Sequence, residues 1–361
     1  MTNNKSNDTS RSSYPSFFQS WDNAVSTGKK PGFFEPEELI EIIEIYITDN
    51  EIDKAKQAID YALQIYSDND ELLYDILLLL NDFELWNDLL NLCEKYKDRA
   101  EVWGDGHKLT ALLHLGMEDD AFLFFKKLKS KYSEDKEGLS IVYQAMGEAL
   151  HEMDLYDSSI DVMEEAKKLL GEEADFYWIQ LQSYVSLGEK EMVVELGEKI
   201  QKMDALNAET WHRLGIIYKE IDDFERSVEA FEYAQSLGYD PQQNLMNLIY
   251  AYEKNDNYNK ALEKAKEYLN LYPDSYLVNI IAAKICSQIE NWEEALEYIE
   301  EAIKLMPSMD SLYLYKSNFL LKLDESRKAK LALQEGINKT GDLEGDLQKE
   351  LDRLNNLYSD I

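Results

Sequence analysis

Histidine and cysteine are the side chains best suited to bind a metal ion, and their spacing in this chain argues against such a site. His107 and His114 are seven residues apart, two turns of a helix, so they can share one helix face. A metal site needs a tight group of ligands, usually three or four residues apart on a helix. No third ligand is obvious near this pair, and we predict no metal or other cofactor. We expect all four histidines, the other two being His151 and His212, to be solvated side chains on helices.

Residues that could act as nucleophiles or as acid–base pairs also lack a catalytic pattern. There is no G-x-S-x-G, P-loop or dinucleotide-binding motif. The acidic pairs, such as Glu164-Glu165 and Glu293-Glu294, recur regularly along helix exteriors and are typical of solvated faces. Cys93 and Cys286 occupy apolar positions far apart in the chain, which indicates core thiols in a reducing compartment. We therefore predict that the protein is not an enzyme.

Composition narrows the class of protein further. The 361 residues carry a formal charge of −35, yet 45% are hydrophobic, which is ample for a packed core. A strongly acidic surface repels phosphate backbones, so we expect no nucleic-acid partner. The longest apolar run, residues 76–80, is far too short to span a membrane, and the polar start lacks the features of a signal peptide. A cytoplasmic protein without membrane insertion is the expectation.

An internal repeat defines the elements that must position any site. One motif, an aromatic residue, two polar residues, a small residue and an aliphatic residue, begins at Tyr156, Phe224, Tyr258 and Trp292. The last three starts are separated by 34 residues and the first two by twice that distance. A fixed period of this length is the signature of a helical repeat array.

The 34-residue frame divides most of the chain into helix–turn–helix units. Within each unit, apolar residues recur at three- and four-residue spacing in two segments separated by a polar or glycine-containing turn. We predict about nine repeats between residues 35 and 341, starting near residues 36, 70, 102, 140, 174, 208, 242, 276 and 310. The frame shifts between Tyr96 and His107, where we expect a kink, and Gly104-Asp105-Gly106 should interrupt the helix there.

Small residues recur at two places in the frame. The twentieth place holds alanine or serine in most repeats, including Ser159 and Ser227, and the eighth place holds Gly147 and Gly215. Two helices approach closely only where neither presents a large side chain. We therefore predict that these two places meet where the helices of one repeat cross.

The chain resembles the tetratricopeptide repeat family. Residues 208–239 match its pattern best, through Trp211, Leu214, Gly215, Tyr218, Phe224, Ser227, Phe231 and Ala234. This resemblance implies an all-α fold, a right-handed superhelical solenoid. Residues 342–361 would form a C-terminal capping helix with Leu343, Leu347, Leu351 and Leu354 facing inward.

The resemblance also implies a concave groove lined by the first helices, which would bind a protein or peptide. The matching places here hold Gln144, Glu148, His151, Trp178, Gln182, His212, Met246, Tyr250 and Lys284. Trp178 and Tyr250 would be contact residues, or they would simply pack between repeats. The cations that some relatives use to hold chaperone tails are missing, which disfavours that role. We predict a scaffold or adaptor, with the acidic field favouring a basic partner. The alternative is a regulatory sensor whose superhelix changes shape on binding a small peptide.

Residues 1–34 form a polar tail that contains one short amphipathic helix. Its apolar stripe consists of Tyr14, Phe17, Phe18, Trp21 and Val25. This helix would cover the exposed edge of the first repeat, as the end of a solenoid requires. The alternative is a docking segment that enters the acidic groove or recruits a partner. The sequence leaves the oligomeric state open.

Overall fold

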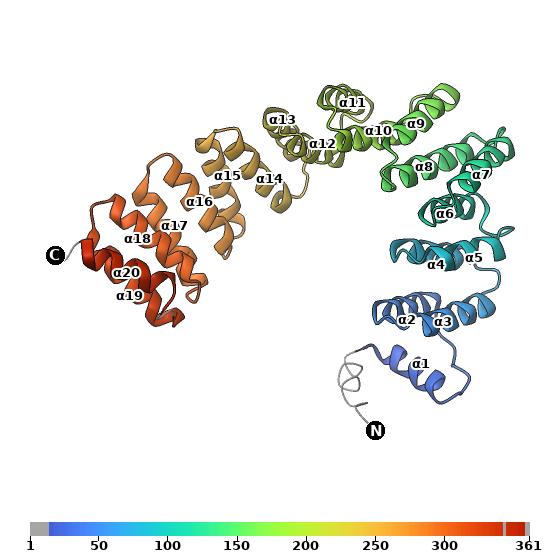
Figure 1. The fold of residues 1–361 in the computed structure, drawn as a ribbon, viewed down its shortest axis with the longest axis horizontal. Coiled ribbons are helices and arrows are strands. Elements are labelled where there is room, and N and C mark those ends of the chain that lie inside the picture. Colours follow the sequence, from blue (N-terminus) through green and yellow to red (C-terminus); the bar gives the residue numbers. More distant parts are fainter. Residues whose placement is uncertain (1–13, 342–343, 358–361) are drawn as a thin grey trace. The chain divides into compact units, whose positions relative to one another are not determined.

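The computed structural model describes residues 14–341 and 344–357, and within these ranges the protein is all-helical with no strand. The chain divides into two compact units, residues 1–187 (unit 1) and residues 188–361 (unit 2). Within each unit, consecutive helices pack in the order of the sequence, from blue to green in unit 1 and from olive to red in unit 2 (Figure 1). The prediction of an all-α repeat fold is confirmed.

Twenty helices make up the described parts of the chain. Unit 1 contains α1 (Ser16–Ser26), α2 (Pro36–Thr48), α3 (Ile52–Ile65), α4 (Asp70–Asp82), α5 (Trp86–Lys95), α6 (Glu101–His114), α7 (Glu118–Lys131), α8 (Lys136–Glu152), α9 (Tyr156–Leu170) and α10 (Ala174–Leu187). Unit 2 contains α11 (Lys190–Met203), α12 (Ala208–Glu220), α13 (Phe224–Ser236), α14 (Pro241–Lys254), α15 (Tyr258–Leu271), α16 (Tyr276–Gln288), α17 (Trp292–Leu305), α18 (Asp310–Lys322), α19 (Ser326–Thr340) and α20 (Asp346–Leu357). The even-numbered helices α2 to α18 are called the first helices below.

Local capping starts many of the first helices. Asn69, Asn207 and Ser275 each accept a hydrogen bond from a backbone N–H of the first turn of their helix. Pro36 and Pro241 occupy first-turn positions, where the missing N–H of proline costs no helical hydrogen bond. These signals fix where each helix begins, while burial of its apolar face supplies most of its stability.

A residue with left-handed backbone follows each of these first helices, after a one-residue C-cap where one is defined. Asp154, Gly188, Asp222, Asp256, Glu290 and Asp324 recur at 34-residue intervals with φ between 54° and 75°. Asn50, Glu84 and Gly116 have positive φ at the corresponding turns of the earlier repeats. A left-handed residue ends a helix abruptly and lets the chain reverse. The repeat is therefore encoded in backbone geometry as well as in side-chain pattern.

The small residues at the eighth and twentieth places of a repeat meet where its two helices cross, as predicted. A Cβ added to Gly215 would lie 2.6 Å from the buried Phe231 ring, and one added to Gly147 would lie 2.4 Å from the Met163 methyl group. The Ser227 hydroxyl donates to the Gly215 carbonyl oxygen at 2.8 Å, and the Ser159 hydroxyl donates to that of Gly147 at 2.7 Å. These hydrogen bonds satisfy polar groups that the close crossing buries.

The segment Gly104-Asp105-Gly106 lies inside α6, so the expectation that it interrupts the helix was wrong. An alanine at Gly104 would place its Cβ 2.3 Å from that of Ala100, and one at Gly106 would lie 3.3 Å from that of Ala145. Gly104 therefore leaves room for the Ala100 side chain, and neither glycine forms a turn. Helices α5 and α6 also pack together across the expected kink, and the extra residues lengthen α8, which has 17 residues.

The helix α1 packs against α2 and α3, the first of the two arrangements considered for the tail. Phe18 and Trp21 are fully buried, and Tyr14, Phe17 and Val25 pack around the same core. The Asp22 carboxylate accepts hydrogen bonds from the Tyr46 hydroxyl at 2.9 Å and from the Lys54 ammonium at 3.1 Å. With its apolar stripe occupied in this way, α1 offers no free docking face in the structure.

At the other end of unit 2, α20 packs against α18 and α19. Leu347, Leu351 and Leu354 are buried, and Leu347 lies against Gly336, while the predicted Leu343 falls outside the described residues. No described helix is both long and apolar enough to cross a membrane.

Candidate functional site

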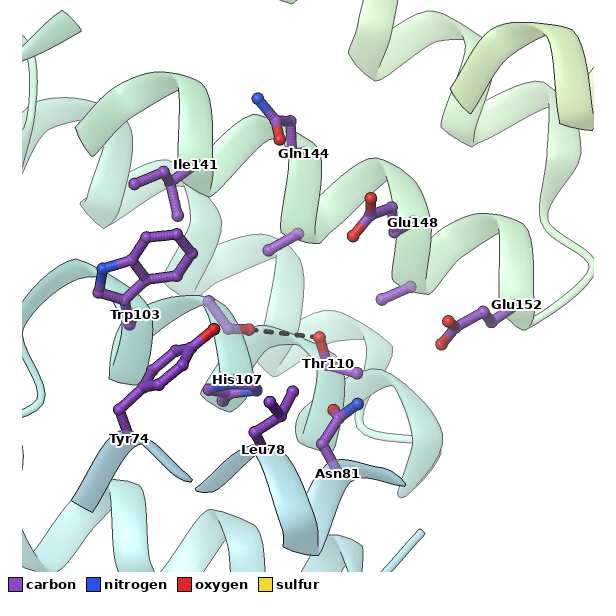
Figure 2. Close-up of a pocket in the computed structure, with 13 residues that line it drawn as sticks. Tyr74, Leu78, Asn81, Trp103, His107, Thr110, Ile141, Gln144, Glu148 and Glu152 are labelled. Atoms are coloured by element: carbon purple, nitrogen blue, oxygen red, sulfur yellow. Dashed lines mark hydrogen bonds between the residues drawn. The ribbon is translucent and has the colours of Figure 1, made fainter. Parts of the chain in front are cut away.

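A hollow of unit 1 lies on three successive first helices, α4, α6 and α8 (Figure 2). It has a volume of about 220 Å³. Its lining consists of Tyr74, Leu78, Asn81, Trp103, Gly106, His107, Thr110, Ile141, Gln144, Ala145, Glu148, Ala149 and Glu152. Residues from three repeats therefore contribute to one concave surface.

Small residues contribute to the lining of this hollow. Gly106 of α6 faces Ala145 of α8, and Ala149 follows one helical turn later. The Thr110 hydroxyl folds back onto the Gly106 carbonyl oxygen at 3.3 Å (Figure 2). Larger side chains at these places would fill the space, so the small residues are what keep it open.

Aromatic rings form one wall of the hollow. Tyr74 and Trp103 meet edge to face, with ring centroids 5.6 Å apart, and half of the Trp103 surface is exposed. The ring of His107 lies 6.2 Å from that of Tyr74. Burial lowers the pKa of His107, an effect that the nearby Asp82 only partly opposes, so this histidine is neutral at neutral pH. The wall is aromatic and uncharged, and it is open to solvent at Trp103.

Carboxylates stand at the opposite side of the hollow (Figure 2). Protein atoms around Glu148 displace water and raise its pKa, and the negative charges of Glu152 and Asp175 raise it further. Glu152 lies 3.0 Å from the His114 Nε2 atom, and His114 in turn stacks on Trp86 with centroids 4.0 Å apart. Glu148 forms no ion pair or hydrogen bond with any other residue that the structure describes. A cation placed beside Glu148 would therefore gain an unused partner.

The residues expected to line the groove differ in position and exposure in unit 1. Gln144 and Glu148 line the hollow, and Gln182 is exposed. His151 is half-buried, with its Nδ1 atom 3.1 Å from the Ser183 hydroxyl. Trp178 is only 7% exposed, so it supports the surface from within and offers little area to a partner.

The sequence reasoning missed Tyr74, Leu78 and Asn81, which line the same hollow. They stand at the fifth, ninth and twelfth places of the repeat that begins at residue 70. Gln144, Glu148 and His151 occupy these same places in the repeat that begins at residue 140. Applying the same groove places to the repeat that begins at residue 70 would have predicted them.

In unit 2 a shallower hollow of about 780 Å³ lies between α12, α14 and α15. Met246 lines it, together with the edge of His212. His212 is not solvated as expected, because it is 4% exposed, stacks on Tyr239 at 4.0 Å and lies 3.1 Å from the Asn244 side-chain oxygen. Burial lowers its pKa, so it too is neutral at neutral pH.

Tyr250 and Lys284 remain accessible on the first helices of unit 2. Tyr250 is 43% exposed and has two ammonium groups over its ring, those of Lys219 at 5.9 Å and Lys254 at 5.5 Å. Lys284 lies over the Tyr315 ring at 5.4 Å. These contacts place cations beside aromatic rings, the reverse of the acidic hollow in unit 1.

Groups with metal-binding or nucleophilic chemistry are not gathered anywhere in residues 14–341 and 344–357. No set of three histidine, cysteine, aspartate or glutamate side chains in this part could hold a metal ion. Cys93 and Cys286 are buried, and burial raises the pKa of each thiol to about 12. Both thiols are therefore un-ionised at neutral pH, and thiolate is the reactive form.

One part of the chain matches the model of a known protein family. Residues 208–241, which span α12 and α13, match the model of the tetratricopeptide repeat (TPR) family. No curated protein matches.

Solved structures give the broader likeness. The C-terminal part of a TPR repeat-containing protein from Cytophaga hutchinsonii has 15% identity and a TM-score of 0.51, over 68% of this chain and 98% of that one. YrrB, described as a TPR protein with an unusual peptide-binding site, has 16% identity and a TM-score of 0.41, over 54% of this chain and 99% of that one. MamA from Desulfovibrio magneticus has 15% identity and a TM-score of 0.39, over 48% and 97%. The first of these likenesses supports the helical repeat fold.

Proposed function

Because the chain belongs to the tetratricopeptide repeat family, we propose that it is a non-enzymatic scaffold that binds a protein or peptide along the first helices of unit 1. The observation that carries this proposal is the hollow on α4, α6 and α8, with an exposed aromatic wall and an unpaired carboxylate. Exposed aromatic side chains beside a polar group are common among the residues that contribute most of the binding energy of a protein interface.

The bound segment is proposed to be basic. The first helices of unit 1 carry only two lysines, Lys108 and Lys136, against many acidic side chains. These are Glu37, Glu38, Glu41, Glu44, Asp70, Glu71, Asp75, Asp82, Glu101, Asp105, Glu137, Glu148, Glu152 and Asp175. Such a field attracts cations at a distance and raises the rate of encounter.

Within the hollow, an arginine or lysine of the partner is the side chain that fits both walls. Its aliphatic stem would lie against Trp103 and Tyr74, which are already oriented by their edge-to-face contact. Its charged end would meet Glu148, whose pKa is raised by desolvation and by the nearby charges of Glu152 and Asp175. The neutral His107 adds no repulsion.

The test uses the full chain and a short fluorescent peptide that alternates arginine and serine, followed by anisotropy. We expect Glu148→Gln to weaken binding about fivefold, as loss of one charged partner predicts. The matched control is Glu137→Gln, which removes the same charge from an exposed place on α8 outside the hollow. Its effect should stay within about twofold, as for an exposed charge.

Two results would overturn the proposal. One is equal binding of a second peptide in which glutamine replaces every arginine. The other is an equal loss in the Glu148→Gln and Glu137→Gln proteins, which would reduce the effect to net charge alone. Thermal melting of each variant confirms that the fold is intact.

A further inference from the structure

Four lysines on the first helices of unit 2 combine two features, an aromatic ring beside the ammonium group and the lack of an ion pair within the described residues. Lys219 of α12, Lys254 of α14, Lys284 of α16 and Lys322 of α18 form no ion pair with any residue that the structure describes. By contrast, Lys264, Lys266 and Lys316 in the same unit each pair with a glutamate. Lys202 and Lys339, on second helices of the same unit, also lack an ion pair in the described chain, but neither has an aromatic ring beside it.

Each of the four ammonium groups lies over an aromatic ring instead. Lys219 and Lys254 share Tyr250, Lys284 uses Tyr315, and Lys322 lies 5.5 Å from the centre of the Trp292 ring. The ring attracts the cation without neutralising it. The lysines are thus held near the surface with their charge still available to a ligand.

The helix dipole explains only part of this placement. Lys219, Lys254 and Lys322 lie in the last turn of their helices, where a cation is favourable. Lys284 lies in the middle part of α16 and has the same contact with a ring. Three exposed lysines, Lys254, Lys284 and Lys322, therefore share a feature that the dipole does not supply.

Polar groups around Tyr250 extend this surface. The Lys219 ammonium donates to the Asn247 side-chain oxygen at 3.1 Å, and Asn247 also lines the shallow hollow of unit 2 beside Met246. Tyr250 itself remains 43% exposed between its two lysines. An extended chain lying on α14 would meet amide groups first and then two cations flanking a ring.

We propose that the first helices of unit 2 form a second docking surface, which binds an acidic segment of a partner protein through aspartate or glutamate side chains. Charge complementarity selects this partner, because the available ammonium groups have no carboxylate of their own in the described chain. The surface is separate from the hollow of unit 1 and does not depend on the function proposed for it. A protein with both surfaces would connect a basic partner to an acidic one.

The experiment measures binding of a short fluorescent peptide that alternates glutamate and serine to the full chain. The triple variant Lys254→Gln/Lys284→Gln/Lys322→Gln should bind about tenfold more weakly, since three charged contacts are lost. The matched control is Lys202→Gln/Lys304→Gln/Lys339→Gln, which removes three lysines from the last turns of second helices in the same unit. This control should stay within about twofold of the unaltered protein.

Equal weakening in the two triple variants would overturn the proposal, because it would show a response to net charge only. Failure of the unaltered protein to bind the glutamate peptide, or equal binding of a glutamine analogue, would overturn it as well. If the triple variant melts early, the single variant Tyr250→Leu replaces it, with Tyr250→Phe as its control. The leucine variant should weaken binding and the phenylalanine variant should not, because only phenylalanine keeps the aromatic ring.

Discussion

Units 1 and 2 are built from the same helix pairs but present opposite charges on their first helices. Those of unit 1 are dominated by carboxylates. Those of unit 2 carry Arg213, Lys219, Lys254, Lys284, Lys316 and Lys322 against Glu209, Glu220, Glu253 and Asp310. The repeat constrains the small places and the turn, and it leaves the surface places free to differ. The contrast teaches that architecture and specificity are encoded at different positions of the same 34-residue frame.

Substitutions of glycine at the helix crossings should have the largest effect on stability, and this effect should differ between the two units. Gly215→Ala would push a methyl group into the buried Phe231 ring at 2.6 Å, and we expect a loss of about 2 kcal/mol in the free energy of unfolding. Gly106→Ala meets Ala145 at 3.3 Å and also gains about 1 kcal/mol of helix propensity, so its net effect should be near zero. Urea unfolding of the full chain measures both, and similar losses would contradict this difference.

Substitutions of exposed aromatic residues should affect the two binding surfaces independently. We expect Trp103→Ala to weaken binding of the arginine peptide about tenfold and to leave binding of the glutamate peptide unchanged. Tyr250→Ala should weaken binding of the glutamate peptide and leave binding of the arginine peptide unchanged. Anisotropy with both peptides on both variants gives four values, and a variant that weakened both peptides equally would show that the surfaces are coupled or misassigned.

The left-handed turns are shared by the units, and glycine there should be mildly stabilising in both. Glu84 in unit 1 and Glu290 in unit 2 have φ of 56° and 57°, a conformation that is unfavourable for residues with a Cβ. We expect Glu84→Gly and Glu290→Gly each to add about 0.5 kcal/mol, since relief of strain exceeds the added freedom of the unfolded chain. Glu297→Gly, inside α17, is the control and should lose about 1 kcal/mol. A loss at Glu290 equal to that at Glu297 would rule out strain at the turn.

The smallest expected effect is the pH dependence of stability, which has opposite signs in the two units. Burial lowers the folded-state pKa of His212, so the unfolded chain binds its proton first and stability falls as the pH drops below the ordinary histidine value. Glu148 is exposed, but desolvation by nearby protein atoms and the charges of Glu152 and Asp175 raise its pKa, so stability falls as the pH rises above the ordinary carboxyl value.

Melting temperatures of the His212→Gln and Glu148→Gln proteins, measured against the unaltered chain from pH 4 to pH 8, check these signs. The His212 variant should lose less stability than the unaltered chain on acidification, and the Glu148 variant should lose less on going to higher pH. Differences of about 2 °C or less are expected for a chain of this size. Curves that stay parallel for both variants would contradict the assignment.

Much of the fold follows from periodic positions. The places of Gly215 and Ser227 in the frame were sufficient to predict a close helix crossing, because the same small residues recur at Gly147 and Ser159 in another repeat. The interior of α6 was not predictable in this way. Its glycines suggest a turn by propensity, whereas α6 packs against α5 and α8, a tertiary effect that propensity does not include.

Some residues of the candidate site could also be predicted from the repeat pattern, and others could not. Gln144 and Glu148 were found because they stand in a regular repeat, whereas Tyr74 was missed because Leu89 obscures the register of its own repeat. The burial of His212 depends on Tyr239, which lies in the connection between α13 and α14 where periodicity gives no information. Trp103 lies in the part of the chain where the frame shifts.

The spacing of the left-handed residues has a consequence for how the length of this protein can change. From Asp154 to Asp324 the turn inside each repeat holds a left-handed residue at the same 34-residue interval, so a 34-residue block begins and ends at equivalent points of the frame. A block can be deleted or duplicated without asking the adjoining turns to adopt a new shape. Removing residues 242–275, for example, would delete Tyr250 and Lys254 while joining two helices at an equivalent point of the frame. Binding capacity in such a chain can be gained or lost in whole modules, with the neighbouring helices serving as ready-made acceptors.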